Sequence, residues 1–248
     1  MNFLNHYLIQ ESKEREQLDK TVDYLSKKEK VLLLTTSNRW KEHETDIPKS
    51  TQLGIYVNEQ LGKQKSTLIK VPQLKIYPCE GNVSSSPEKG GNHCGVKDAV
   101  LKDKAKNPTG YHRCWASINN KDDELWKISK ELFESDAVLI FGSIRWGQAN
   151  AYYQKLIERL TWIENRWTSL GEANLNKDRD AGVIFIGHNW NGDSVVDTQK
   201  EVLKYFGFKT PAEMSWNWQY TSNSWMESKE SYLKDYQTFE KKFLVNPE

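Results

Sequence analysis

The chain has 248 residues, enough for one large domain with a full hydrophobic core. Lys and Arg number 35 and Asp and Glu 34, so the net charge is +1, and the interspersed charges argue against a nucleic-acid-binding stripe or an acidic tail. No apolar run approaches the length of about 18 residues that a membrane span needs, and the N-terminus lacks a secretory signal. We therefore expect a cytoplasmic protein that binds neither membranes nor nucleic acid.

The N-terminal residues 1–29 predict a helical arm that precedes a main domain of residues 30–248. Apolar residues recur there at helical spacing among charged ones. They are Phe3, Leu4, Tyr7 and Leu8, then Leu18, Val22 and Leu25. The arm either packs on the surface of the domain or contacts another subunit, and the sequence does not separate these two alternatives.

Residues 31–34 form an apolar run that predicts a first buried strand. Polar residues follow, and Pro48 is well placed to open a helix. Hydroxyl groups, backbone amides and a cation at a helix N-terminus can bind phosphate. The candidates here are Ser37, Arg39, Ser50 and Thr51. The alternative is that Ser50 only caps the helix and Arg39 is a solvated surface charge.

Residues 66–77 predict a second strand that lies near an edge, because Pro72 cannot donate a hydrogen bond to a neighbour. Residues 78–120 show no clear periodicity and predict a long insertion, which in a compact domain is usually functional or disordered.

The insertion contains all three cysteines of the chain. They are Cys79, Cys94 and Cys114, with His93 and His112 nearby in the sequence. An odd number of cysteines argues against a disulfide framework. An iron-sulfur cluster held by four cysteines is impossible with three. A zinc site of three cysteines and a histidine would lack the usual pair of closely spaced cysteines. We therefore predict ordinary thiols and no metal.

The middle of the chain predicts a helix, a strand and a second helix in succession. Residues 125–133 are amphipathic, and residues 137–141 are an uninterrupted apolar run typical of a strand buried on both faces. A short loop over residues 142–148 follows, and a helix begins near Ala149. This alternation favours a parallel sheet with right-handed crossovers.

The last third continues the alternation. Residues 181–187 predict a buried strand, residues 188–193 a loop, and residues 195–206 a helix. Trp216 and Trp218 belong to an alternating segment that predicts a half-exposed edge strand, where they cover a dimer contact or line a substrate space. A final helix is expected within residues 223–244.

These elements predict an α/β fold with a five-stranded parallel sheet and helices on both faces. Such sheets bind ligands beyond the carboxyl ends of the strands, where the strand order reverses. Trp40, Trp146 and Trp190 each follow a predicted strand, so we expect the three to gather at that edge.

Short motifs at the same edge resemble those of a known family. Phe141-Gly142-Ser143 followed by Ile144-Arg145-Trp146-Gly147 resembles the flavin-ring loop of flavodoxin-fold NAD(P)H-dependent FMN reductases, which usually read Gly-Ser-Pro, an aromatic residue and Trp-Gly. Ser37 and Arg39 match the serine and arginine of the family's Gly-Ser-x-Arg, with Thr36 in the glycine position. The resemblance covers roughly residues 30–210. It extends to the iron-sulfur flavoproteins, whose compact cysteine motif is missing here.

The resemblance implies a flavodoxin-like three-layer sandwich, with the strand order 2-1-3-4-5, that binds FMN. The implied cofactor-binding residues are Ser37, Arg39, Trp40, Ser50, Thr51, Gly142, Ser143, Ile144, Arg145, Trp146, Gly147, His188, Asn189 and Trp190. It also implies hydride transfer from NAD(P)H through FMN to a small acceptor such as a flavin, a quinone or a nitro compound. No side chain is expected to act as a general acid or base, because the flavin supplies the chemistry.

The same resemblance implies a homo-dimer or homo-tetramer. Two other functions remain open on this fold. The protein could be a non-enzymatic FMN-binding electron carrier, although such carriers are typically strongly acidic. It could also be an interaction module that has lost the flavin, which the non-standard Thr36 and Ile144 would allow.

Overall fold

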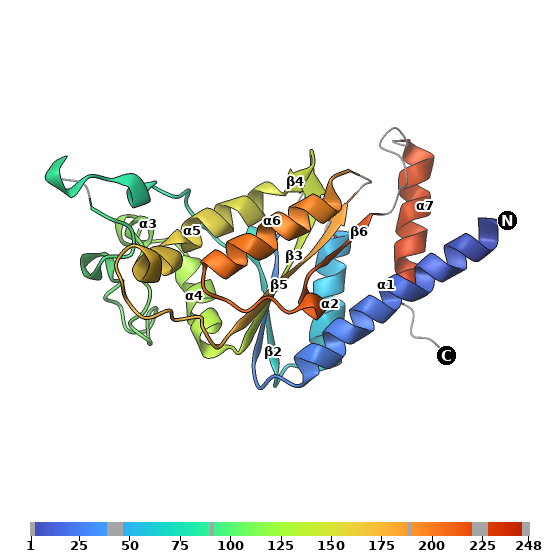
Figure 1. Ribbon diagram of the computed structural model, residues 1–248, viewed down its shortest axis with the longest axis horizontal. Coiled ribbons are helices and arrows are strands. Elements are labelled where there is room, and N and C mark those ends of the chain that lie inside the picture. Colours follow the sequence, from blue (N-terminus) through green and yellow to red (C-terminus); the bar gives the residue numbers. More distant parts are fainter. Residues whose placement is uncertain (1–2, 39–46, 90–91, 188–189, 220–227, 245–248) are drawn as a thin grey trace.

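The computed structural model describes residues 3–38, 47–89, 92–187, 190–219 and 228–244. They form a parallel sheet with helices on both faces (Figure 1). The parallel strands are β1 (Val31–Thr35), β2 (Ser66–Lys70), β3 (Ala137–Arg145), β5 (Asp180–Gly187) and β6 (Trp216–Gln219). Their order, β2-β1-β3-β5-β6, confirms the predicted arrangement. One further strand, β4 (Gln148–Ala149), pairs antiparallel with the end of β3 and was not expected.

Most of the helices form two layers, one on each face of the sheet. They are α1 (Phe3–Ser26), α2 (Lys49–Leu61), α3 (Trp115–Asn119), α4 (Leu125–Glu134), α5 (Ala151–Thr168), α6 (Gly192–Tyr205) and α7 (Lys229–Phe239), which continues as a π-helical turn over Glu240–Leu244. Helices α4, α5 and α6 pack on one face of the sheet, whereas α1, α2 and the C-terminal turn pack on the other.

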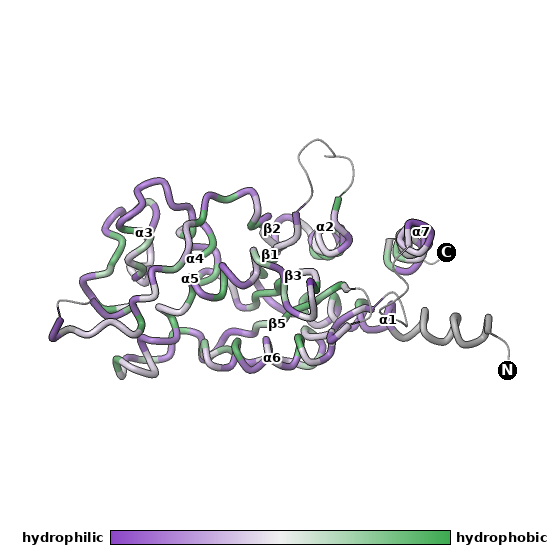
Figure 2. Tube along the Cα trace, turned by 90° about the horizontal axis from the view of Figure 1, so that it is seen from above, coloured by the Kyte–Doolittle hydropathy of each residue, from purple (hydrophilic) through white to green (hydrophobic). Residues whose placement is uncertain are grey.

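The strands have apolar side chains on both faces because both faces are covered. In β1, Leu32 and Leu34 point into the core beneath α4, α5 and α6, whereas Val31 and Leu33 point into the core beneath α1 and α2. This explains why the central strands read as continuous apolar runs rather than alternating ones. Figure 2 shows the same pattern, with hydrophobic segments concentrated along the central strands.

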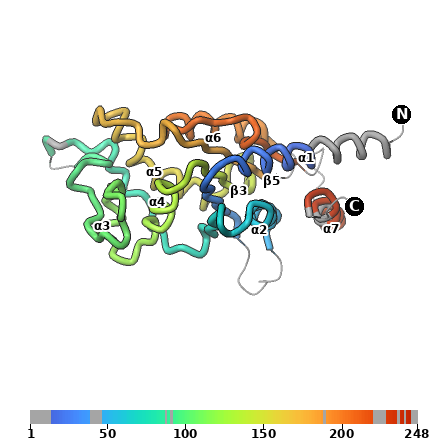
Figure 3. The backbone as a smooth tube through the Cα atoms, turned by 90° about the horizontal axis from the view of Figure 1, so that it is seen from below, coloured from blue at the N-terminus to red at the C-terminus, as the bar shows by residue number. Residues whose placement is uncertain are grey.

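The second half of α1 is built into the core. Leu18 and Leu25 are fully buried, and the indole nitrogen of Trp216 donates to the Thr21 hydroxyl at 3.0 Å. The Tyr24 hydroxyl donates to the Asp180 carboxylate at 2.8 Å. Figure 3 shows α1 running beside α2 across this face of the sheet. From Leu18 onward, α1 therefore packs on the main domain, which is the first of the two alternatives.

The two tryptophans of β6 pack against aromatic rings near the C-terminus of the chain. Trp218 is only 2% exposed and packs against Phe239 and Phe243, with ring centroids 5.7 and 5.2 Å apart. Trp216 stacks on Phe243 at 6.3 Å. The C-terminal turn therefore covers Trp218, which is too buried for either predicted role, whereas Trp216 stays partly exposed.

The described residues of the insertion lie at one end of the molecule, beyond α4 and α5 (Figure 1). Within its described residues it has little regular structure apart from α3 and short 3₁₀ turns. Polar side chains on α5 hold it in place. The Asn165 side-chain amide donates to the Cys94 carbonyl at 2.5 Å, and the Arg166 guanidinium donates to the Tyr111 carbonyl at 2.9 Å. Hydrogen bonds from side chains of α5 to backbone carbonyls thus attach the insertion to the domain.

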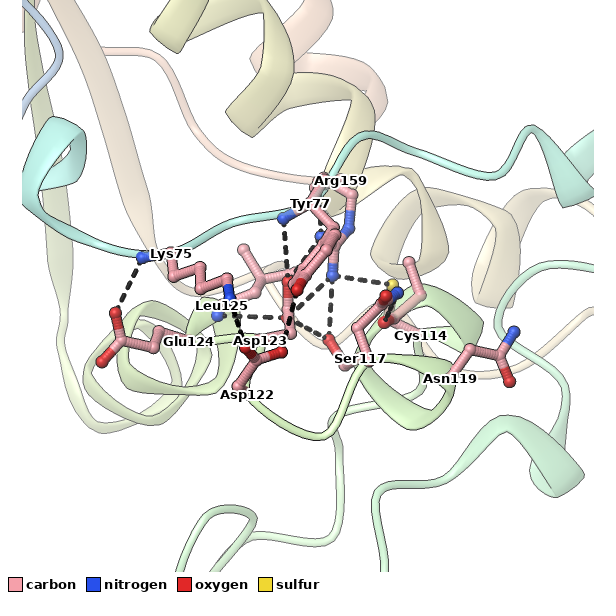
Figure 4. A network of polar contacts seen from close by, with 12 residues as sticks. Lys75, Tyr77, Cys114, Ser117, Asn119, Asp122, Asp123, Glu124, Leu125 and Arg159 are labelled. Carbon is pink, nitrogen blue, oxygen red and sulfur yellow. Dashed lines mark hydrogen bonds and ion pairs between the residues drawn. The ribbon is translucent and has the colours of Figure 1, made fainter.

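A fully buried ion pair completes this attachment (Figure 4). Arg159 of α5 and Asp123, just before α4, have completely inaccessible side chains and approach to 2.8 Å. The guanidinium also donates to the Tyr77 carbonyl at 2.7 Å and the Ser117 hydroxyl at 2.9 Å. Burial alone would raise the pKa of Asp123, but the Arg159 guanidinium outweighs it and the pKa is lowered. The pair therefore stays ionised inside the protein.

His112 is a second buried titratable group of the insertion. It is 1% exposed, and its Nδ1 lies 2.8 Å from the Ser129 hydroxyl, whereas Nε2 is buried without a hydrogen-bond partner. Burial, reinforced by the nearby Arg159 charge, lowers the pKa of His112 to about 3. The imidazole is therefore neutral in the folded protein at neutral pH.

We expect His112 to make the protein acid-sensitive. An unfolded histidine titrates near pH 6.5, so between about pH 6.5 and pH 3 the unfolded chain binds a proton that the folded chain refuses. The free energy of unfolding should fall as pH decreases, by about 1.4 kcal/mol per pH unit near pH 5. Urea unfolding of the wild type and of His112→Gln between pH 7 and pH 4.5 would measure this. Equal slopes for the two proteins would contradict it.

Candidate functional site

The carboxyl ends of β1 and β3 are joined by a polar contact between Thr36 and Asn150. The Thr36 amide donates to the Phe141 carbonyl at 2.9 Å, and the Asn150 side-chain amide donates to the Thr36 carbonyl at 2.6 Å. The Asn150 side-chain oxygen lies 2.9 Å from the Thr36 hydroxyl. Both residues are buried, so the contact fixes how the end of β1 meets the start of α5.

Asn150 was not among the predicted site residues. It immediately precedes α5, where asparagine commonly caps a helix, but its side chain makes no capping hydrogen bond. The side chain contacts Thr36 instead, 114 positions earlier in the sequence. The only sequence signal was an asparagine at a predicted helix start, and that signal pointed to a local role.

Three of the predicted phosphate-binding residues come together next to this contact. The Ser50 hydroxyl donates to the Ser37 hydroxyl at 2.7 Å, and the Thr51 hydroxyl contacts the Ser37 carbonyl at 3.5 Å. We call Ser37, Ser50 and Thr51 the hydroxyl cluster. Ser37 is half-buried, whereas Ser50 and Thr51 are 2% and 3% exposed. The cluster joins the end of β1 to the first turn of α2.

The N-terminus of α2 lies at this cluster. Pro48 occupies the N-cap position and makes no side-chain capping hydrogen bond. The first amides of a helix have no acceptor within the helix, and the helix dipole places partial positive charge there. Hydroxyl donors beside such amides suit an anion. The predicted partners Arg39 and Trp40 lie outside the described residues.

Residues 142–148 do not form the predicted irregular loop. β3 continues through Arg145, and Ile144 and Arg145 pair with Ala149 and Gln148 in an antiparallel hairpin. The predicted loop is therefore wrong, because the hairpin pairs much of its backbone. Its two-residue turn, Trp146-Gly147, has φ angles of +51° and +69°, as in a type I′ turn.

Glycine is required at Gly142, where the strands leave no room for a side chain. A Cβ atom there would lie 2.5 Å from the Phe185 ring and 3.1 Å from the Thr36 hydroxyl. Ile144, which takes the place of the family's proline, packs over Gly187 of β5, where an added Cβ would lie 2.8 Å from the Ile144 Cβ. The small residues thus set the close spacing of β3 and β5 at the site edge.

The hairpin tip contacts the loop between β5 and α6. The Asn191 side-chain amide donates to the Gly147 carbonyl at 2.8 Å, and a Cβ atom added at Gly147 would lie 3.4 Å from the Trp190 ring. Trp146 is 89% exposed and Trp190 is 55% exposed. Trp146 and Trp190 therefore do lie at one edge, as expected. His188 and Asn189 lie outside the described residues.

Trp146 combines high exposure with an unfavourable backbone conformation. A positive φ is uncommon for a bulky residue and costs about 1–2 kcal/mol, yet Trp146 adopts it while almost none of its ring is buried within the described structure. Arg145, beside it, is also exposed. An exposed aromatic ring held in a strained turn is a reasonable candidate for ligand contact.

We expect Trp146→Asn to stabilise the protein. Asn-Gly is the preferred pair for a type I′ turn, and little buried area is lost. The gain should be about 1 kcal/mol, which raises the melting temperature by about 2–4 °C in a chain of this size. Trp146→Ala is the matched control, since alanine removes the ring but keeps the strain. A gain in melting temperature for Trp146→Ala equal to that of Trp146→Asn would contradict this explanation.

The described residues contain no group of three or more His, Cys, Asp or Glu side chains placed to hold a metal ion. In the same part of the chain, no helix combines the length and the apolar character needed to cross a bilayer.

Neither a protein-family model nor a curated protein sequence matches the chain. Solved structures do resemble it. RosB, solved with bound 8-demethyl-8-formylriboflavin-5′-phosphate, has a TM-score of 0.51 at 16% identity over 85% of this chain and 74% of its own. An azoreductase from Bacillus anthracis has a TM-score of 0.49 at 14% identity over 86% and 96%. A putative quinone reductase from Klebsiella pneumoniae has a TM-score of 0.46 at 13% identity over 86% and 83%.

The observed sheet order, the helices on both faces and the similarity to RosB agree. The chain has a flavodoxin-like α/β fold. At 16% identity the similarity establishes the fold and leaves the function to the residues of the site.

Proposed function

We propose that this protein binds FMN at the carboxyl edge of its sheet and passes reducing equivalents from NAD(P)H to a small acceptor such as free flavin, a quinone or a nitro compound. The observation that carries the proposal is the hydroxyl cluster at the start of α2. The cluster follows the carboxyl end of β1, and the strand order of this fold reverses between β1 and β3, where such folds bind ligands.

The hydroxyl cluster fits a phosphate monoester. Such a group accepts several hydrogen bonds and carries a charge near −2, which suits hydroxyl donors beside the N-terminus of a helix. None of the three cluster residues carries a negative charge that would repel it. RosB, whose fold this chain shares, binds a riboflavin 5′-phosphate derivative, which supports a flavin phosphate as the ligand.

The hairpin tip fits an aromatic ring system. Trp146 and Trp190 present exposed ring surface at the same edge of the sheet, and stacking on an aromatic ring would bury it. The Asn191 to Gly147 hydrogen bond holds the two loops together, so the tip is fixed before a ligand arrives. We propose that the ring of the flavin lies beside this tip.

FMN, when bound, supplies the hydride chemistry. The residues of this chain would orient it. The hydroxyl cluster would hold the phosphate, and the Thr36 to Asn150 contact would hold the end of β1 against the start of α5. No side chain of the described site needs to move a proton, so we assign no catalytic residue.

Anaerobic reduction of the FMN-loaded protein tests the activity. We expect NADPH or NADH to bleach the bound flavin absorbance, and a quinone or nitro compound then to restore it with multiple turnovers. Bound FMN that neither nucleotide reduces would overturn the reductase proposal and favour an electron carrier instead.

A further inference from the structure

The three cysteines lie in three parts of the insertion, and hydrogen bonds join these parts around α3 and Arg159. The Arg159 guanidinium donates to the Tyr77 carbonyl at 2.7 Å, and it lies 3.5 Å from the Cys114 sulfur (Figure 4). Cys79 is two residues beyond Tyr77. One guanidinium group therefore joins the segment of Cys79 to the thiol of Cys114.

Two further hydrogen-bonded contacts draw these segments together. The Asn119 amide at the end of α3 contacts both carboxylate oxygens of Glu80, at 3.0 and 3.1 Å. Because Glu80 follows Cys79 and Cys114 precedes α3, these bonds hold the two cysteine segments side by side. The Trp115 indole donates to the His93 carbonyl at 3.1 Å, which places Cys94 in the same region.

The environments of the three thiols differ. Cys79 is half-buried, and its sulfur accepts a hydrogen bond from the Gly81 amide at 3.4 Å. Cys114 is buried beside the Arg159 cation. Cys94 is buried, and burial, followed by the nearby Cys114 and Cys79 thiols, raises its pKa to about 12. Apolar burial keeps a thiol such as that of Cys94 protonated.

We propose that Cys79 and Cys114 form a reversible oxidation site, separate from the candidate flavin site, in which Cys79 reacts with hydroperoxides and Cys114 resolves the product as a disulfide. Cys79 is the thiol with access to solvent, and Cys114 is the neighbouring thiol with a cation at its sulfur. Cys94 does not take part.

The chemistry balances with the peroxide as oxidant. The Cys79 thiolate attacks one peroxide oxygen, the O–O bond breaks, and a sulfenic acid forms while the other oxygen leaves and takes up a proton as water. The Cys114 thiolate then attacks the Cys79 sulfur, the S–S bond forms, and hydroxide leaves and is protonated to a second water. Two thiols are oxidised by two electrons, and one hydrogen peroxide is reduced to two waters.

Disulfide mapping of the full-length wild-type protein tests the proposal. The protein is treated with one equivalent of hydrogen peroxide, remaining thiols are alkylated, and a proteolytic digest is analysed by mass spectrometry without reduction. We expect the loss of two thiols per chain, a linked peptide pair containing Cys79 and Cys114, alkylated Cys94, and recovery of three thiols with dithiothreitol.

Single substitutions provide matched controls. Cys94→Ser should leave the loss of two thiols unchanged, whereas Cys79→Ser should slow thiol loss at least tenfold. A link that includes Cys94, a link between two chains, or no thiol loss in the wild type would overturn the proposal. These measurements need no flavin, so their outcome is independent of the proposed reductase activity.

Discussion

Asp123→Ala is expected to destabilise the protein by about 3–5 kcal/mol, because it leaves the Arg159 charge buried without its partner. The guanidinium would retain its hydrogen bonds to Tyr77 and Ser117, but these carry no compensating charge. Urea unfolding followed by circular dichroism measures the change in the free energy of unfolding.

Asp122→Ala is the matched control, since the two aspartates are adjacent. Asp122 pairs with Lys75 at the surface, and both side chains are more than half exposed. Exposed pairs contribute about 0–1 kcal/mol, so the control should lose little stability. Similar losses for Asp122→Ala and Asp123→Ala would contradict the importance of the buried pair.

The double variant Asp123→Leu with Arg159→Met separates the charge effect from packing. Replacing both members of a buried pair by apolar residues is often nearly neutral, whereas removing one is costly. We therefore expect the double variant to be more stable than Asp123→Leu alone. A double variant as unstable as the sum of the two single variants would show that the charges do not interact.

Ser37→Asp is expected to weaken FMN binding by about 100- to 1000-fold. Two unit charges about 4 Å apart repel by about 4 kcal/mol at an effective dielectric constant of 20, which corresponds to about three orders of magnitude in affinity. Part of this is offset, because the N-terminus of α2 attracts both charges. Titration of the apoprotein with FMN, monitored by flavin fluorescence, measures the dissociation constant.

Ser37→Asn is the control, because asparagine has nearly the shape of aspartate without the charge. We expect it to bind FMN within about tenfold of the wild type, and riboflavin, which lacks the phosphate, to bind Ser37→Asp and Ser37→Asn alike. Equal FMN affinities for Ser37→Asp and Ser37→Asn would place the phosphate elsewhere.

Much of the fold could be predicted from the sequence because the central strands are apolar on both faces. The apolar runs that begin at Val31, Ala137 and Ala181 predicted the buried strands. The helices between these runs predicted that the strands are parallel. The hairpin at Trp146-Gly147 was missed, since its turn uses a tryptophan where asparagine or glycine is usual. A two-residue strand such as β4 also has no periodicity to detect.

The candidate site was predicted in part for a similar reason. The hydroxyl cluster follows from local positions, just after a strand and at the start of a helix, and the structure brings its three residues together. Asn150 and Asn191 were missed because their partners, Thr36 and Gly147, are distant in the sequence. The buried Arg159 and Asp123 were missed likewise, since each reads as an ordinary surface charge until the insertion folds over it.

Comparative binding of FMN and riboflavin to the wild-type protein tests the central proposal most directly. Isothermal titration calorimetry of the purified, flavin-free protein gives both dissociation constants and the stoichiometry. We expect one FMN per chain and at least tenfold weaker binding of riboflavin, because the hydroxyl cluster at α2 holds the phosphate. No heat of binding with either compound would contradict a flavin site at this edge of the sheet.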